Sequence, residues 1–226
     1  KNEREYLSAN AAISGFIYDD WSWDVSLTLG NSTQDLTINN ELRSDRLDSD
    51  YNTIGPCETD NSCPEFSPFA RPSQEVLDYV LDSHLTKTDV TNSAVTANIS
   101  GDAFELPAGP LQIAFGAEAR YEALKYDPSE LWQSGNISSS KTPMDADRTI
   151  IEAYTEILVP VISDVALIKS LDVEMAVRAA DYSTESASFT SSKFGINWAI
   201  DDSWRFRSTL SQAVRAPQLT EMFAGQ

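Results

Sequence analysis

The feature that most constrains this chain is a strict alternation of apolar and polar residues that recurs along its length. In residues 19–30, DDWSWDVSLTLG, Trp21, Trp23 and Val25 fall on one face of an extended chain, and Ser22 falls on the other. Successive side chains of a strand point to opposite faces, so a period of two predicts strands. The same period recurs at 111–123, 171–179, 193–200 and 204–210, and less regularly at 5–17, 93–104 and 149–161. We therefore predict an all-β fold with about eight antiparallel strands.

The connections between the predicted strands differ in length at the two ends. Short links lie near 18–20, 105–110, 162–169 and 201–203. The alternate set comprises two long, polar and acidic links, 31–92 and 125–148, and a brief one near 183–188. Short turns at one end and mostly long loops at the other are typical of outer-membrane barrels, whose long loops are extracellular.

One short helix is predicted inside the long link 31–92. Residues 73–84, SQEVLDYVLDSH, place Val76 and Val80 at helical spacing after Pro72. Apolar residues at this spacing, preceded by a proline, are typical of the start of a helix. The remainder of the link is predicted to be an extracellular loop.

Both a soluble β-sandwich and a membrane barrel contain alternating strands, so the question is which face meets water. The polar faces mix opposite charges, such as Glu118 with Arg120, as expected of a confined wet interior. The apolar faces carry aromatic residues near strand ends, including Trp21 and Trp23, which membrane interfaces favour. We therefore expect the odd-numbered residues of 21–29 to face lipid and the even-numbered residues between them to face a lumen.

The charge of the chain restricts its partners and its chemistry. A net charge of −19, from 35 acidic and 16 basic residues, excludes a nucleic-acid partner, because a polyanion would be repelled. The sequence contains one histidine, His84, and no recognisable nucleophile triad, general acid and base pair or Gly-rich phosphate loop. We therefore predict no catalytic residues and no enzymatic activity.

Two features of the first long link suggest local chemistry. Cys57 and Cys63 lie six residues apart among turn-forming residues, and we predict a disulfide, with two thiols in a reducing compartment as the alternative. Asp45, Asp48 and Asp50 are close enough in sequence to bind Ca²⁺ through their carboxylates. The loop lacks the Gly and terminal Glu of an EF-hand loop, so a solvated acidic loop is the alternative. No other cofactor is predicted.

The carboxyl-terminal part of the chain resembles one family of membrane proteins. SQAVRAPQLTEMF, residues 211–223, resembles the segment of TonB-dependent outer-membrane receptors in which a strand ends in Arg-Ala-Pro and a Leu-x-Glu-Leu-Phe-like stretch follows. The matching positions are Arg215, Ala216, Pro217, Leu219, Glu221, Met222 and Phe223, with Met222 in place of the usual leucine. ISGFIYDDWSWDVSLTLG and GPLQIAFGAEARYE are similar to barrel hairpins and strands of the family, and CPEFSPFARPSQEVLDYV to one of its long extracellular loops.

The resemblance implies a barrel of about 22 strands closed by an amino-terminal plug, which imports a scarce ligand with energy from a TonB partner protein. Residues 1–226 are then a partial barrel domain in the bacterial outer membrane, with the plug and the TonB-binding region upstream. The family carries siderophores, cobalamin and oligosaccharides, and the resemblance of the Cys-Pro-Phe loop favours an oligosaccharide. A complete eight-stranded barrel acting as an adhesin or structural protein, and a secreted β-sandwich binding module, are the alternatives.

A receptor of this kind would meet outer-membrane lipid on its apolar face and its small-molecule or oligosaccharide ligand at the loops and the upper lumen wall. The candidate ligand contacts are aromatic and polar residues of the long links, namely Tyr51, Phe66, Trp132 and Asn136. The alternative for these four residues is that the long loops pack on themselves.

Overall fold

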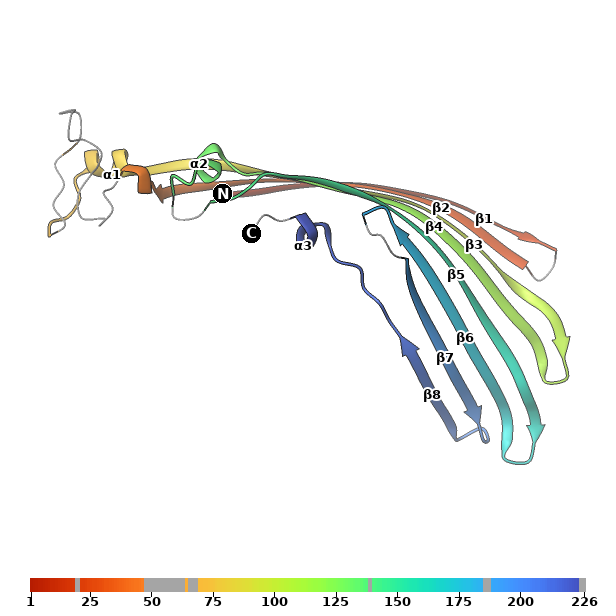
Figure 1. Cartoon of the computed structure of the whole chain (residues 1–226). Helices are drawn as coiled ribbons and strands as arrows, with labels where there is room; N and C mark the ends of the chain where they lie inside the picture. Colours follow the sequence, from red (N-terminus) through yellow and green to blue (C-terminus); the bar gives the residue numbers. More distant parts are fainter. Residues whose placement is uncertain (19–20, 47–63, 65–68, 138–139, 185–187, 224–226) are drawn as a thin grey trace.

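The computed structural model describes residues 1–18, 21–46, 64, 69–137, 140–184 and 188–223. These residues form one eight-stranded sheet in which every strand pairs antiparallel with the next strand of the chain (Figure 1). The strands are β1 (Asn2–Ile17), β2 (Trp21–Leu42), β3 (Leu81–Leu106), β4 (Gly109–Asp127), β5 (Met144–Val165), β6 (Ile168–Tyr182), β7 (Phe189–Ala199) and β8 (Arg205–Gln212). The predicted all-β fold with eight antiparallel strands is confirmed.

The sheet is open at both edges. In the described part of the chain β1 pairs with β2 alone, and β8 pairs with β7 alone. A complete eight-stranded barrel would pair its first and last strands, and a β-sandwich would contain a second sheet. The arrangement of the described strands therefore argues against both alternatives to a partial barrel.

β2 and β3 are longer than the alternation predicted. Residues 31–42 and 81–92, which we expected in a loop, form the outer ends of these strands, so the connection between them is 43–80. In residues 31–42 every odd position is polar and the apolar residues Leu36, Ile38 and Leu42 fall on even positions, the reverse of 21–29, so the pattern of 21–29 does not continue. The pairing continues nonetheless, because the ladder is made by backbone groups that every residue carries.

Among the described residues, four short helices lie between or after the strands. They are the 3-10 helix η1 (Ser44–Arg46), α1 (Gln74–Val80), α2 (Glu130–Ser134) and α3 (Leu219–Phe223). α1 is the predicted helix, but it ends at Val80 and residues 81–84 begin β3. α2 was not predicted, although Ser129 caps it and Gly135 ends it with a φ of 73°. The helices among the described residues are too short and too polar to cross a bilayer.

The predicted difference between the two ends of the sheet is confirmed. The short connections join Ile17 to Trp21, Leu106 to Gly109, Val165 to Ile168 and Ala199 to Arg205. They lie together at one end of the curved sheet, which we call the turn end, and α1 and α2 lie at the other, the loop end (Figure 1). Two of the tight connections use the left-handed backbone region, at Tyr18 and Leu167, with φ of 58° and 65°.

The strand register separates apolar and polar side chains onto two faces. Residues paired directly across neighbouring strands share a face, so Trp23 and Ile99 lie on one face, and Asp24 and Asn98 lie on the other. Pro217, which follows β8, accepts a hydrogen bond from Arg148 of the polar face, and Figure 1 shows the segment after β8 on the inside of the bend. The polar face is therefore concave and the apolar face is convex.

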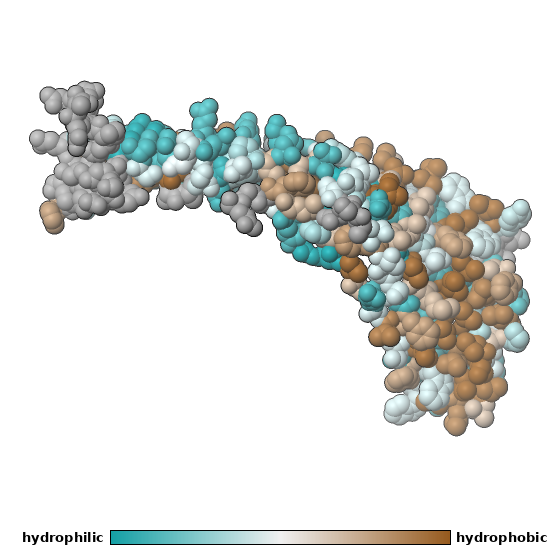
Figure 2. Space-filling model, viewed as in Figure 1, coloured by the Kyte–Doolittle hydropathy of each residue, from teal (hydrophilic) through white to brown (hydrophobic). Residues whose placement is uncertain are grey.

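The convex face is uncharged over the part nearest the turn end. From Trp21 to Leu29 on β2, from Leu111 to Tyr121 on β4 and from Leu171 to Ala179 on β6, every residue of this face is uncharged. Toward the loop end the same face carries Glu5, Asp35, Lys87, Asp89, Lys125, Asp145 and Asp147. Figure 2 shows the same gradient, from hydrophobic residues near the turns to hydrophilic residues near the loops. An uncharged band of this kind is what a lipid-facing surface requires.

Candidate functional site: a charged network on the concave face

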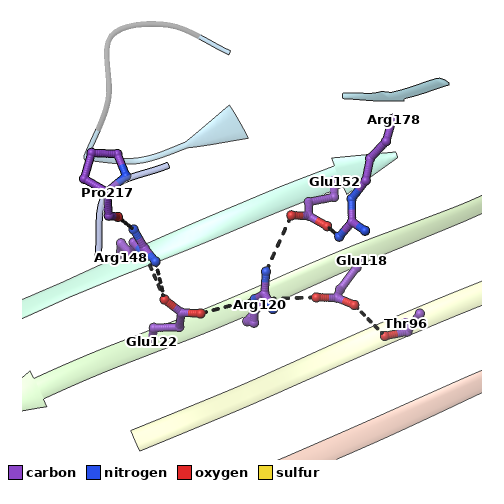
Figure 3. A network of polar contacts seen from close by, with 8 residues as sticks. All are labelled: Thr96, Glu118, Arg120, Glu122, Arg148, Glu152, Arg178 and Pro217. Carbon is purple, nitrogen blue, oxygen red and sulfur yellow. Dashed lines mark hydrogen bonds and ion pairs between the residues drawn. The ribbon is translucent and has the colours of Figure 1, made fainter. Parts of the chain in front are cut away.

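Charged residues converge on the concave face where β4 and β5 pair. Glu118, Arg120 and Glu122 occupy every second position of β4, so all three share that face. Glu152 and Arg148 of β5 lie opposite Glu118 and Glu122 in the register. We call these five residues, with Thr96 of β3 and Arg178 of β6, the concave network (Figure 3).

Arg120 lies at the centre of the concave network. Its Nε lies 3.5 Å from Glu118 Oε1 and 3.4 Å from Glu122 Oε1, and its Nη2 donates to Glu152 Oε1 at 3.5 Å. Thr96 adds a hydroxyl that donates to Glu118 Oε2 at 3.2 Å. One guanidinium thus lies among three carboxylates from two strands, and it offsets the repulsion that would otherwise separate them.

Glu152 is the most buried carboxylate of the network, with its side chain 3% exposed. Its Oε1 accepts from Arg120, and its Oε2 accepts a short hydrogen bond from Arg178 Nη2. A carboxylate removed from water is costly unless it is paired and hydrogen-bonded, and here each oxygen has its own guanidinium. Glu152 therefore links β4, β5 and β6 at one point.

Arg148 joins the network to the segment that follows β8. Its side chain is 9% exposed, and its Nε and Nη2 lie 2.8 Å and 2.7 Å from Glu122 Oε2. Its Nη1 donates to the carbonyl oxygen of Pro217 at 2.6 Å, and its guanidinium lies 5.2 Å from the centre of the Tyr182 ring. Arg148 therefore holds residues 213–223, which we call the C-terminal strap, against the concave face.

The strap contains the predicted family motif, and an ion pair closes it. Arg215 Nη2 donates to both oxygens of Glu221, at 2.8 Å and 3.0 Å, and the Gln218 N–H donates to Glu221 Oε2 at 2.7 Å. Ala216 and Pro217 lie between the paired residues, and α3 carries Glu221 and Phe223. Leu219, which is buried, anchors α3. The Arg-Ala-Pro and Glu positions therefore form one closed turn of the chain.

This turn is expected to loosen in acid. The pKa of Glu221 lies below its ordinary value of 4.5, because the Gln218 N–H and the Arg215 guanidinium hydrogen-bond its carboxylate. A lowered pKa in the folded state means that the pair stabilises the strap fully above pH 4.5, and that this contribution is lost as pH falls through the lowered pKa. Amide-exchange protection of 218–223, corrected for intrinsic rates, should fall over that window. Glu221→Gln should remove the pH dependence, and an unchanged dependence in that variant would contradict the assignment.

Gly116 of β4 lies so close to a neighbouring side chain on the concave face that no larger residue fits at this position. The Tyr154 ring of β5 covers it, and a Cβ at position 116 would overlap that ring. Tyr154 Oη donates a short hydrogen bond to Asn98 Oδ1, which holds the ring in place. We expect Gly116→Ala to lower the free energy of unfolding by about 1 to 3 kcal/mol, measured by urea unfolding in phospholipid vesicles.

Gly30→Ala is the matched control for that substitution. Gly30 also lies inside a strand on the concave face, but a Cβ there would be 3.5 Å from the Asn92 carbonyl oxygen and 3.6 Å from Tyr6 Oη, which are ordinary contacts. The free energy of unfolding of the Gly30→Ala variant should therefore change little. If both variants lowered the free energy of unfolding equally, the Tyr154 ring would not be the reason that position 116 requires glycine.

A second polar cluster lies at the loop end and contains one of the predicted ligand contacts. Trp132 of α2 packs edge-on against His84, with ring centroids 4.9 Å apart, and its Nε1 donates to Glu41 Oε1 at 3.4 Å. His84 lies between Glu41 Oε2, at 2.5 Å from its Nε2, and Ser129 Oγ, at 2.8 Å from its Nδ1. Trp132 thus connects α2 to β2 and β3 through Glu41 and His84.

The remaining predicted site residues are not gathered at one place. Asn136 accepts the Ser44 N–H at its backbone oxygen, 2.8 Å away. Asp45 accepts from Arg43 through both carboxylate oxygens, at 3.0 Å and 2.6 Å, so this carboxylate is already occupied. Tyr51, Phe66, Asp48, Asp50, Cys57 and Cys63 lie outside the described residues. The disulfide, the Ca²⁺ site and the ligand contacts therefore stay predictions.

Arg148 and Glu152 are the residues that sequence reasoning missed. Both lie within or beside the weakly alternating stretch 149–161, where Tyr154 and Glu156 continue the polar face at even positions. Charged residues at even positions in and next to this predicted strand could have indicated that Arg148 and Glu152 lie on the polar face. The sequence does not show that Glu122 and Arg178 would be their neighbours, because those pairings depend on the strand register.

An open antiparallel sheet with an uncharged convex band, an ion-paired concave face and all its short turns at one end defines the protein as a segment of a transmembrane β-barrel. Residues 2–226 match the family model described as TonB dependent receptor-like, beta-barrel, and the chain belongs to this family. It is a family of outer-membrane transport receptors and not of enzymes. A comparison with curated proteins gave no match.

Proposed function

We propose that this chain forms part of the wall of a receptor in the bacterial outer membrane that takes up a scarce ligand. The observation that carries the proposal is the contrast between the two faces of one sheet. The convex face is uncharged over the band near the turns, whereas the concave face holds ion pairs such as that of the buried Glu152 with the half-exposed Arg178. A wall between lipid and a wet lumen needs this division.

The uptake itself requires parts beyond this wall. We propose that energy comes from a TonB protein that contacts a region upstream of this chain, as the family resemblance implies. The ligand, a siderophore, cobalamin or an oligosaccharide, would enter over the loop end, where Tyr51, Phe66, Trp132 and Asn136 are the candidate contacts. The chain is proposed to act without chemical catalysis, with Ca²⁺ as a structural ion if the acidic link binds one.

The experiment is made on the full-length protein in its native envelope. Membrane fractionation and gel mobility before and after boiling are measured on the same sample. We expect an outer-membrane protein whose mobility shifts on boiling, because a closed barrel resists unfolding by detergent until it is heated. A protein found in the soluble fraction with unchanged mobility would overturn the proposal.

A further inference from the structure

A cavity of about 410 Å³ lies between the concave face and the C-terminal strap. Four arginines line it: Arg120, Arg148, Arg178 and Arg215. Glu152 is the single carboxylate among its described lining residues. The whole chain has 35 acidic and 16 basic residues, so this concentration of guanidinium groups is opposite to the overall charge.

Two of the four guanidiniums lie within the concave network and are mostly shielded from solvent, with side chains 9% (Arg148) and 29% (Arg120) exposed. Arg148 uses Nε and Nη2 on Glu122 and Nη1 on Pro217. Arg120 lies against the carboxylates of the concave network through Nε and Nη2. Arg148 therefore has few hydrogens left to offer a ligand, and Arg120, which lies among three carboxylates, forms part of the floor of the cavity.

The other two guanidiniums retain unused donors. Among the described residues, Arg178 donates only through Nη2, to Glu152, and Arg215 donates only through Nη2, to Glu221. A guanidinium carries five N–H donors in a planar fork. The two side chains are 50% and 68% exposed, so an anion can reach them from solvent.

Glu152 does not fill the place of such an anion. It is 3% exposed, and its oxygens are taken by Arg120 and Arg178. Its carboxylate therefore fixes the direction of the Arg178 guanidinium and leaves the other side of that group open. A bound carboxylate could then accept two parallel hydrogen bonds from one guanidinium, the geometry that arginine favours.

Two aromatic rings complete the cavity wall. Tyr182 and Phe189 both line it, and their ring centroids lie 5.4 Å apart at an angle of 88°. The Arg148 guanidinium lies over the Tyr182 ring, so one side of the cavity is aromatic, while the exposed guanidiniums of Arg178 and Arg215 make its opening cationic. We propose that this cavity binds an anionic part of the receptor's ligand, a carboxylate carried on a ring, as in a uronic acid or an aromatic acid. The inference rests on the proposed function and names the chemistry of its ligand.

The test uses the full-length protein in detergent and isothermal titration calorimetry. The probes are galacturonate, benzoate, inorganic phosphate and the uncharged sugar galactose. We expect galacturonate or benzoate to bind more tightly than phosphate, and galactose to give no heat of binding. The better of the two carboxylates identifies the kind of ring. Equal binding of galactose and galacturonate, tighter binding of phosphate, or no binding of either carboxylate would overturn the inference.

Variants then assign the binding to this cavity. Arg215→Gln should weaken carboxylate binding about tenfold, because a charged hydrogen-bond donor is lost. Arg178→Lys retains the charge beside Glu152 but removes the planar fork, and should also weaken binding. Arg207→Gln is the control, because Arg207 lies on the concave face of β8 but does not line the cavity. An equal effect of all three variants would mean that the anion is attracted by general charge and not by this site.

Failure of this inference can be told apart from failure of the proposed function. Fractionation and heat-dependent gel mobility are measured on the same preparation before any titration. A heat-modifiable outer-membrane protein that binds no carboxylate would contradict the cavity assignment alone. A soluble protein without a mobility shift would contradict the receptor proposal, whatever it binds.

Discussion

Leu27→Arg is expected to lower the free energy of unfolding by about 2 to 4 kcal/mol, measured by urea unfolding in phospholipid vesicles. Leu27 lies on the convex face of β2, and its neighbours in the register are Ala11 of β1 and Val95 of β3. It lies in the uncharged band that the proposed function places against lipid. An arginine there must either lose its hydration or distort the bilayer around it, and both cost free energy.

Thr28→Arg is the matched control for that substitution. Thr28 is the next residue of the same strand and points to the concave face, where it lies between Asn10 and Ala94. An arginine on a wet face keeps its hydration, so its cost should be small. If Thr28→Arg cost as much as Leu27→Arg, or more, the assignment of the convex face to lipid would be wrong.

Glu152→Ala is expected to lower the free energy of unfolding by about 2 to 3 kcal/mol in the same measurement. The substitution removes the acceptor of Arg120 and Arg178 and leaves two guanidiniums side by side without it. Breaking a fully buried pair costs more than this, but the Arg178 side chain is 50% exposed, so water compensates part of the loss.

Glu156→Ala is the control, because Glu156 lies on the same face of β5, opposite Ala114 and Ala176 in the register. It lies outside the concave network. Its removal should therefore change stability by no more than a typical surface substitution. Equal effects of Glu152→Ala and Glu156→Ala would mean that the concave network adds nothing to the stability of the sheet.

The alternating stretches predicted the strands and their two faces correctly, because a strand with one apolar face has apolar residues at every second position of the sequence. Residues 111–123 lie within β4, and their odd and even positions lie on the convex and concave faces as expected. The prediction failed at 31–42, since the face that is apolar over 21–29 is polar from Asn31 to Thr37, and the apolar residues Leu36 and Ile38 lie on the other face. It also missed α2 and α3, which have five residues each and are too short to show a helical period.

The identity of the C-terminal strap was also readable from the sequence, because Arg215, Pro217 and Glu221 stand at recognisable spacing. The contacts that these residues make could not be predicted from the sequence. Their pairing within the strap, and the attachment of Pro217 to Arg148, join groups up to 69 residues apart. Whether such groups meet depends on how the strap folds back over the concave face.

The order of residues along the chain was sufficient to decide which positions form strands, which face of each is apolar and which family the chain resembles. These properties depend on neighbours within a few residues, so a local pattern records them. The partners of Glu152 and the cavity beneath the strap depend on the register of four strands and on the curvature of the sheet. A shift of one residue in any of these pairings would turn the charged side chains to the other face, so only the assembled sheet decides which charges meet.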